Sequence, residues 1–94
     1  MGKFLTEKET EEWLTLETRC IPLPDGTTRP FTGFKLMWRS WDYLILTGKG
    51  RYTPQRLVEL ATINSQEMGY SFDDSLPTVL AYLHRGLRKA QGID

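Results

Sequence analysis

The sequence predicts a single α+β domain over residues 1–94, and three observations support this fold class. A chain of 94 residues suffices for one domain but not for two. Turn residues break its first third into short segments, whereas apolar residues recur with helical spacing in its last third. Thr6 and Glu9 have the spacing of a capping box, which predicts a short N-terminal helix. We expect a helical and extended extension over 1–30 and a strand-helix-helix core over 31–91.

A β-hairpin is predicted where Asp25 and Gly26 interrupt an extended region. Asp bonds its own backbone and Gly tolerates a positive φ, so this pair is a strong turn signal. The flanking segments, 16–23 and 28–36, would form the two strands. Prolines within them cannot donate ladder hydrogen bonds, so these should be edge strands or irregular ones.

Residues 34–39 predict a strand because large apolar side chains occupy every second position and alternate with Lys35, Met37 and Arg39. The two faces would carry, respectively, Phe34, Leu36 and Trp38, and Lys35, Met37 and Arg39. Ser40 could then cap a short helix that begins at Trp41, with Asp42 in its first turn. The apolar run that follows could equally continue as a strand, so the sequence leaves residues 40–47 open between helix and strand.

Two C-terminal helices are predicted from their caps and their apolar spacing. Thr53 is a good N-cap, Pro54 suits the first helical position, and Gly69 marks the end of this helix. The last helix should begin near Asp74 or Ser75. Its apolar stripe consists of Leu76, Val79, Leu80, Leu83 and Leu87.

Side chains that could support catalysis are few and isolated. Cys20 is the only cysteine and His84 the only histidine, and nothing in the sequence places them together. Asp73 and Asp74 are adjacent, so on a helix they point in different directions, and we interpret them as helix caps. No catalytic, metal-binding or dinucleotide motif is present, which predicts a protein that is not an enzyme and has no cofactor.

The single cysteine also bears on the compartment. It can form no intrachain disulfide, which favours a cytoplasmic protein. Because Cys20 lies in the apolar run 20–23, we expect it to be buried or half-buried. No apolar stretch approaches the roughly 18 residues that would span a bilayer, so no membrane partner is expected.

The net charge of zero conceals a basic middle third. Residues 1–28 carry a net −3, residues 29–58 a net +5, and residues 59–94 a net −2. Such asymmetry can mark an anionic partner. It can also simply offset the acidic segments within the fold, and charge alone does not separate these interpretations.

Two features of the basic middle third are compatible with contact to nucleic acid. Trp38 and Trp41 flank Arg39, and aromatic residues interleaved with basic ones suit stacking on single strands. The alternative is that both tryptophans belong to the core. The turn Gly48-Lys49-Gly50-Arg51 could contact phosphate, although its spacing is not that of a P-loop.

From residue 34 onward the order of elements resembles the ribbon-helix-helix family. The resemblance covers about residues 31–89. It rests on the alternating Phe34-Lys35-Leu36, on Trp41-Asp42-x-Leu44 opening one helix and on Thr53-x-x-x-Leu57-Val58 opening another. Members of that family are obligate dimers whose strands pair into an antiparallel ribbon. Outward-facing ribbon residues read bases in the major groove, and the N-terminus of the second helix grips phosphate.

The resemblance implies a small, non-enzymatic regulator of transcription that binds duplex DNA as a homodimer. Lys35, together with Gly33 and Met37, would face the DNA, and Thr53 would meet phosphate. The full set of candidate DNA-contacting residues is Lys35, Met37, Arg39, Lys49, Arg51 and Thr53. The alternative is a protein-interaction module or an accessory protein of the phage type, without nucleic-acid binding. The neutral overall charge and the tryptophan content support this alternative, since aromatic residues anchor interfaces.

Overall fold

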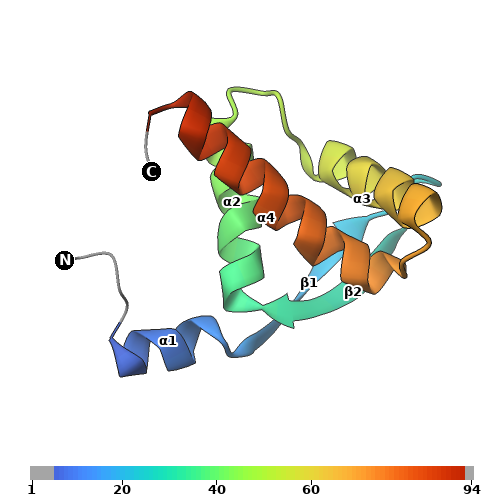
Figure 1. The fold of residues 1–94 in the computed structure, drawn as a ribbon. Coiled ribbons are helices and arrows are strands. Elements are labelled where there is room, and N and C mark those ends of the chain that lie inside the picture. The colour runs from blue at the N-terminus through green and yellow to red at the C-terminus, as the bar shows by residue number, and fades with distance from the viewer. Residues whose placement is uncertain (1–5, 93–94) are drawn as a thin grey trace.

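A computed structural model describes residues 6–92 and confirms the α+β class (Figure 1). The elements in chain order are α1 (Glu7–Trp13), β1 (Leu16–Pro22), β2 (Thr28–Phe34), α2 (Lys35–Thr47), α3 (Pro54–Met68) and α4 (Phe72–Ala90). The strands form one antiparallel two-stranded sheet, and α4 packs against both α2 and α3. None of the helices in this part of the chain is long and apolar enough to cross a membrane.

The N-terminal helix is present with the predicted capping box. The Thr6 hydroxyl accepts a hydrogen bond from the Glu9 backbone N–H at 3.1 Å. The Glu9 carboxylate in turn accepts one from the Thr6 backbone N–H at 3.2 Å. This reciprocal pair satisfies donors that the first turn of a helix leaves free, so α1 begins where the sequence predicts.

The predicted hairpin is confirmed, in the register that pairs Leu16 with Phe34 and Pro22 with Thr28. Its turn forms because Asp25 accepts hydrogen bonds from the backbone N–H and the hydroxyl of Thr27, at 2.9 and 2.6 Å. Gly26 adopts a φ of +89°, which few other residues tolerate. Each strand has one free edge, which is where prolines are compatible with a sheet.

The strand predicted over residues 34–39 is wrong, because α2 begins at Lys35 and continues through residues 40–47. The alternation covers only a few residues, whereas apolar side chains recur with helical spacing over a longer stretch. That stretch buries Met37, Trp38, Trp41 and Leu44 on one side of α2. No side chain caps the helix. Instead, the Lys35 backbone N–H donates to the Thr15 carbonyl at 2.9 Å, a contact that no local pattern reveals.

Both C-terminal helices are confirmed. The Thr53 hydroxyl caps α3 by accepting the Arg56 N–H at 3.1 Å, and Gly69 ends this helix in the left-handed region at φ +73°. The last helix begins at Phe72, earlier than predicted, because Ser71 is its N-cap and its hydroxyl accepts the Asp74 N–H.

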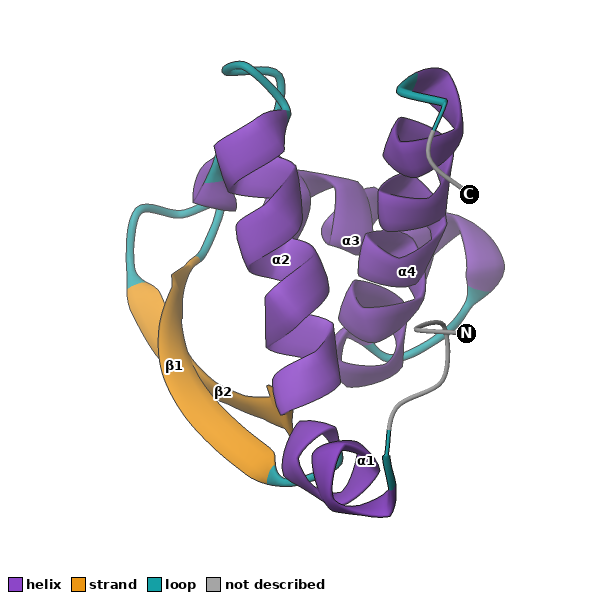
Figure 2. Ribbon diagram, turned by 90° about the vertical axis from the view of Figure 1, so that its left-hand side faces the viewer, coloured by secondary structure: helices purple, strands orange, loops and turns teal. Residues whose placement is uncertain are grey.

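One core unites all of these elements except α1. Figure 2 shows the hairpin curving along one side of α2 and α4 on the other side, and α3 packs against both β1 and α4. The buried apolar residues are Ile21, Phe31, Met37, Trp38, Trp41, Leu44, Leu57, Val58, Ala61, Leu76 and Leu80. Ile21 lies in the first 30 residues and shares this core with Phe31, so the hairpin joins the predicted extension over 1–30 to the predicted core over 31–91.

Two residues of the hairpin and α2 lie elsewhere than predicted. Cys20 is exposed, because side chains alternate along a strand and its neighbour Ile21 points into the core. Asp42 lies in the middle of α2 rather than in a first turn. It accepts two hydrogen bonds from the Arg19 guanidinium, at 2.8 and 3.2 Å, and so joins β1 to α2.

Candidate binding groove

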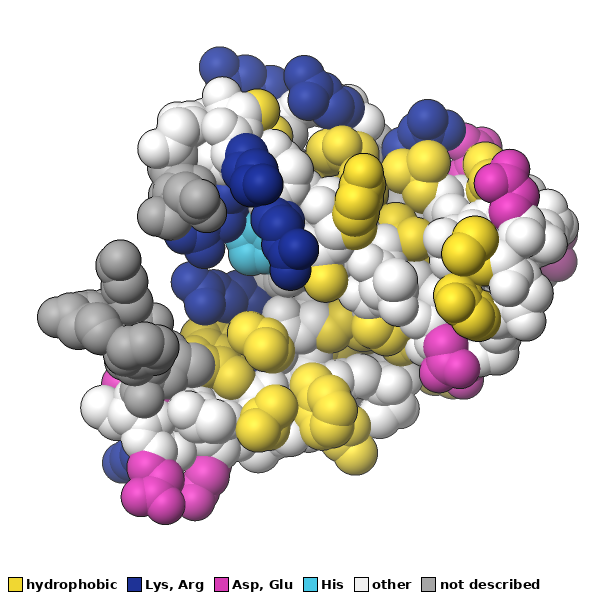
Figure 3. All heavy atoms as spheres, in the orientation of Figure 1, with side chains coloured by type: hydrophobic (Ala, Val, Ile, Leu, Met, Phe, Trp, Pro, Cys, Tyr) yellow, Lys and Arg dark blue, Asp and Glu magenta, His cyan; other side chains and the backbone are white. Residues whose placement is uncertain are grey.

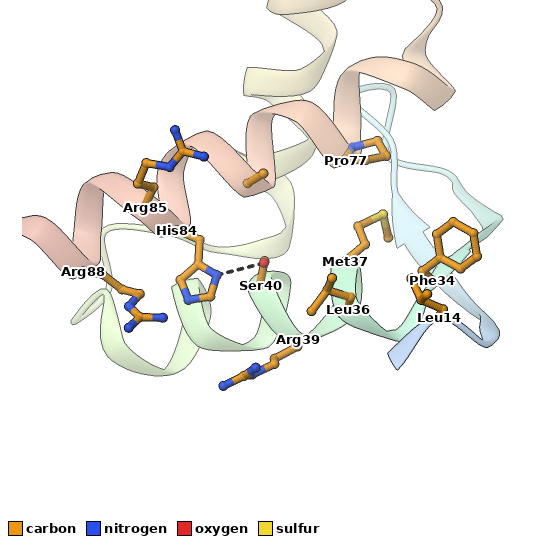
Figure 4. A pocket seen from close by; sticks show the side chains of 11 residues that line it. Leu14, Phe34, Leu36, Met37, Arg39, Ser40, Pro77, His84, Arg85 and Arg88 are labelled. Atoms are coloured by element: carbon orange, nitrogen blue, oxygen red, sulfur yellow. Dashed lines mark hydrogen bonds between the residues drawn. The ribbon is translucent and has the colours of Figure 1, made fainter. Parts of the chain in front are cut away.

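A groove of about 590 Å³ lies between α2 and α4 and reaches the end of the hairpin (Figure 4). One wall comes from the N-terminal half of α2 and the other from α4. Leu14, which follows α1, and Phe34, which ends β2, close one end. We call this feature the α2–α4 groove.

The α4 wall has its own helical pattern. Pro77, Ala81, His84 and Arg88 recur at intervals of four, three and four residues, which places them on one face of the helix. The first residue of this face, Pro77, directly follows Leu76, the first residue of the apolar stripe that packs in the core. Pro77 and Ala81 are small, so the groove stays open between the two helices.

One end of the α2–α4 groove is apolar. Leu14, Phe34 and Leu36 keep 50%, 49% and 44% of their surface exposed, although all three are large apolar residues. Met37 lies buried beside them and packs over Gly33, where a Cβ atom would lie 2.7 Å from its methyl carbon. A cluster of this kind, open to solvent within a hollow, is typical of a site that a partner covers.

The other end is basic, with Arg85 and Arg88, and Arg39 lies between the two ends (Figure 4). None of these arginines forms an ion pair with a carboxylate of residues 6–92. Arg39 instead stacks on the Trp13 ring, with 5.3 Å from guanidinium carbon to ring centroid. On the face drawn in Figure 3, Lys and Arg side chains gather around the histidine, with apolar side chains beside them. No carboxylate is among the described residues that line the groove.

His84 joins the two walls at the basic end. Its Nδ1 lies 2.9 Å from the Ser40 hydroxyl, and its ring packs against that of Tyr43 at a centroid distance of 4.4 Å. Burial lowers the pKa of His84, and the positive charges of Arg88 and Arg39 lower it further. The neutral imidazole therefore contributes a hydrogen bond between α2 and α4 rather than a fourth positive charge.

The six residues predicted to contact DNA do not form one surface. Only Met37 and Arg39 line the α2–α4 groove, and Met37 is buried. Lys35 is exposed at the start of α2, and Lys49 and Arg51 lie in the loop between α2 and α3. The Thr53 hydroxyl already accepts the hydrogen bond that caps α3.

Ion pairs also neutralise part of the positive charge of the basic middle third. Arg29 pairs with Asp73 at 2.5 Å, and Arg56 pairs with Glu59. Trp38 and Trp41 are only 1% and 6% exposed, so the interpretation that places them in the core is correct. Their rings pack against each other rather than being available to stack on bases.

Arg85 and Arg88 of α4 line the groove but are not among the residues that the sequence predicts to bind a partner. They lie in the segment of net −2, so a count by thirds of the chain hides them. The signal that could have found them is the second helical face of α4, on which Pro77, Ala81, His84 and Arg88 recur. Which face of α2 it would meet, however, depends on tertiary packing.

No cluster of three or more potential metal ligands occurs within residues 6–92. Comparison with protein-family models, with curated proteins and with solved structures found no match.

Proposed function

We propose that this chain is a small protein-interaction module whose α2–α4 groove binds a segment of a partner protein. The observation that carries the proposal is the combination, in one groove, of exposed large apolar residues with arginines that form no ion pair to residues 6–92. Protein interfaces are enriched in arginine and large apolar anchors, and such anchors fill hollows on the partner. A groove of about 590 Å³ is large enough to bury several side chains.

Binding of duplex DNA by a homodimer is the second proposal. Its support is the positive charge of Lys49 and Arg51 in the loop after α2 and of Arg85 and Arg88 on α4. Contacts to phosphate use charge and hydrogen-bond donors, however, and leave no role for the apolar end of the groove. Protein binding accounts for both ends, so it is the function that the geometry supports best.

A variant that fills the α2–α4 groove tests the proposal. Ala81 is exposed and lines the groove, so Ala81→Trp should obstruct it without disturbing the core. Ala90→Trp is the matched control, since Ala90 is exposed on the same helix but does not line the groove. Peptides selected from a displayed random library on the unmodified protein should keep their affinity for Ala90→Trp. Their affinity for Ala81→Trp should be at least tenfold lower than for the unmodified protein.

Two outcomes would refute protein binding through the groove. The first is that no selected peptide is sensitive to Ala81→Trp while urea unfolding shows the variant to be folded. The second is tight, salt-sensitive binding of a duplex DNA probe that both variants retain, together with the absence of groove-dependent peptides. This second result would favour the DNA proposal.

A further inference from the structure

We infer that the α2–α4 groove recognises an acidic amphipathic helix of about three turns, with its carboxylates gathered at one end. This inference rests on the proposed function and specifies the partner. It follows from three properties of the groove: the sign of its charge, the separation of charged from apolar residues, and the kind of element that forms its walls.

The sign of the charge selects an acidic partner. Arg39, Arg85 and Arg88 line the groove without ion pairs to residues 6–92, and no carboxylate of those residues lines it. Arg19, by contrast, pairs with both Glu17 and Asp42. Guanidinium groups bind carboxylates with two parallel hydrogen bonds, so free arginines in a groove favour Asp and Glu on the occupant.

The charged and apolar residues occupy different ends, which constrains the order of residues in the partner. Leu14, Phe34 and Leu36 lie at the end near α1, whereas Arg85 and Arg88 lie further along α4 (Figure 4). A matching segment has its large apolar residues toward one end and its acidic residues toward the other. A uniformly acidic peptide would leave the apolar end exposed, and a uniformly apolar one would bury the arginines unpaired.

The walls of the groove favour a helix over an extended strand. An extended peptide gains affinity by pairing its backbone with a free strand edge, but the walls are formed by two helices. A helix satisfies its own backbone and needs only side-chain contacts. The α4 wall runs from Pro77 to Arg88. At about 1.5 Å per residue, this length corresponds to roughly three helical turns of the partner.

The test uses charge reversal with a matched control. Arg85→Glu/Arg88→Glu reverses two charges in the groove, and Lys49→Glu/Arg51→Glu reverses two in the loop outside it. A displayed random-peptide library is selected on each protein, and only peptides that lose binding on Ala81→Trp are counted. A representative peptide is synthesised, its affinity measured by fluorescence anisotropy, and its bound conformation examined by transferred NOEs.

The expected result has three parts. Groove-dependent peptides selected on the unmodified protein carry a net negative charge and bind as helices, with acidic and apolar residues at opposite ends. Arg85→Glu/Arg88→Glu lowers the affinity for the representative peptide at least tenfold. Selection on this variant yields peptides of net positive charge. Lys49→Glu/Arg51→Glu changes the affinity less than threefold, because neither residue lines the groove and salt screens exposed charges that make no contact with the peptide.

Distinct results would overturn the inference and the proposed function. Groove-dependent peptides without an excess of Asp and Glu, or bound in an extended form, would refute the acidic helix while leaving the groove as a binding site. Equal loss on both charge-reversal variants would show a general electrostatic effect and would also refute it. Self-association abolished by Ala81→Trp would identify a second copy of the chain as the occupant. If no peptide depends on the groove, the proposed function itself fails.

Discussion

At the scale of single residues, Trp38 connects the hairpin to the helices. Its indole N–H donates to the Glu17 carbonyl at 2.8 Å, and its ring meets those of Phe31 and Trp41 edge to face. The Arg19 guanidinium lies over the same ring at 5.1 Å. A single buried side chain thus fixes the position of α2, and with it one wall of the α2–α4 groove.

The burial of α2 makes Leu44→Ala strongly destabilising. Leu44 is fully buried, so the truncation removes apolar contacts and leaves a cavity that costs about 2–5 kcal/mol. Leu46→Ala is the matched control on the same helix, because Leu46 is 80% exposed, and it should change stability by less than about 0.5 kcal/mol. Urea unfolding of both variants measures the difference. Equal effects of the two substitutions would contradict the orientation of α2.

His84 should make stability depend on pH in a defined direction. Its pKa in the folded protein is lowered below the ordinary 6.5, chiefly by burial. The unfolded chain therefore binds this proton more readily, and stability present above about pH 6.5 falls as the pH drops toward the folded pKa. In His84→Asn, unfolding free energies measured between about pH 7 and about pH 5 should fall less than in the unmodified protein. An identical fall would show that other groups cause the dependence.

At the scale of elements, the glycine that ends α3 and the glycine inside α4 should respond to alanine substitution in opposite ways, because their backbone conformations differ. Gly69 ends α3 at φ +73°, a conformation that a side chain disfavours, so Gly69→Ala should cost about 1 kcal/mol. Gly86 lies inside α4 with open space around it, so Gly86→Ala should instead stabilise by about 0.5–1 kcal/mol. Urea midpoints that shift in opposite directions confirm both assignments, and shifts of the same sign would refute one of them.

The elements with local signals were predictable, and the start of α2 was not. The Thr6 capping box, the turn at Gly26 and the Thr53 cap each act through neighbours within three residues. The first turn of α2 has no side-chain cap, and the backbone N–H of its first residue, Lys35, donates to the carbonyl of Thr15, which lies twenty residues earlier. A short alternation near Phe34 therefore resembled a strand, because the contact that stabilises the helix is not local.

The α2–α4 groove was only partly predictable for the same reason. Arg39 was singled out by its position in the basic middle third, and the structure places it in the groove. Arg85 and Arg88 were hidden in a segment of net negative charge, and Leu14 lies in the part treated as an extension. These residues meet only because α4 packs against α2, which the sequence periodicity of either helix does not specify.

At the scale of the whole molecule, overall neutrality and local charge have separate consequences. Acidic and basic residues are equal in number, so there is no net charge to steer an anionic polymer from a distance. Ion pairs such as Arg29–Asp73 also remove charge from the basic middle third. Arg39, Arg85 and Arg88 line the α2–α4 groove without an ion pair to residues 6–92, so recognition of an acidic partner should act at short range.

The shared core also predicts that the hairpin and the helices unfold together. Ile21 of β1 and Phe31 of β2 pack in the same cluster as Leu76 of α4, so neither part should be stable alone. The three tryptophans all lie within the first 41 residues, whereas helical circular dichroism is dominated by the longer helices that follow. Tryptophan fluorescence and circular dichroism should therefore give coincident urea transitions. Ile21→Ala should move both by the same amount, at a cost of about 2–5 kcal/mol. A helical signal that persists after the tryptophan transition would show instead that the hairpin is a separable unit.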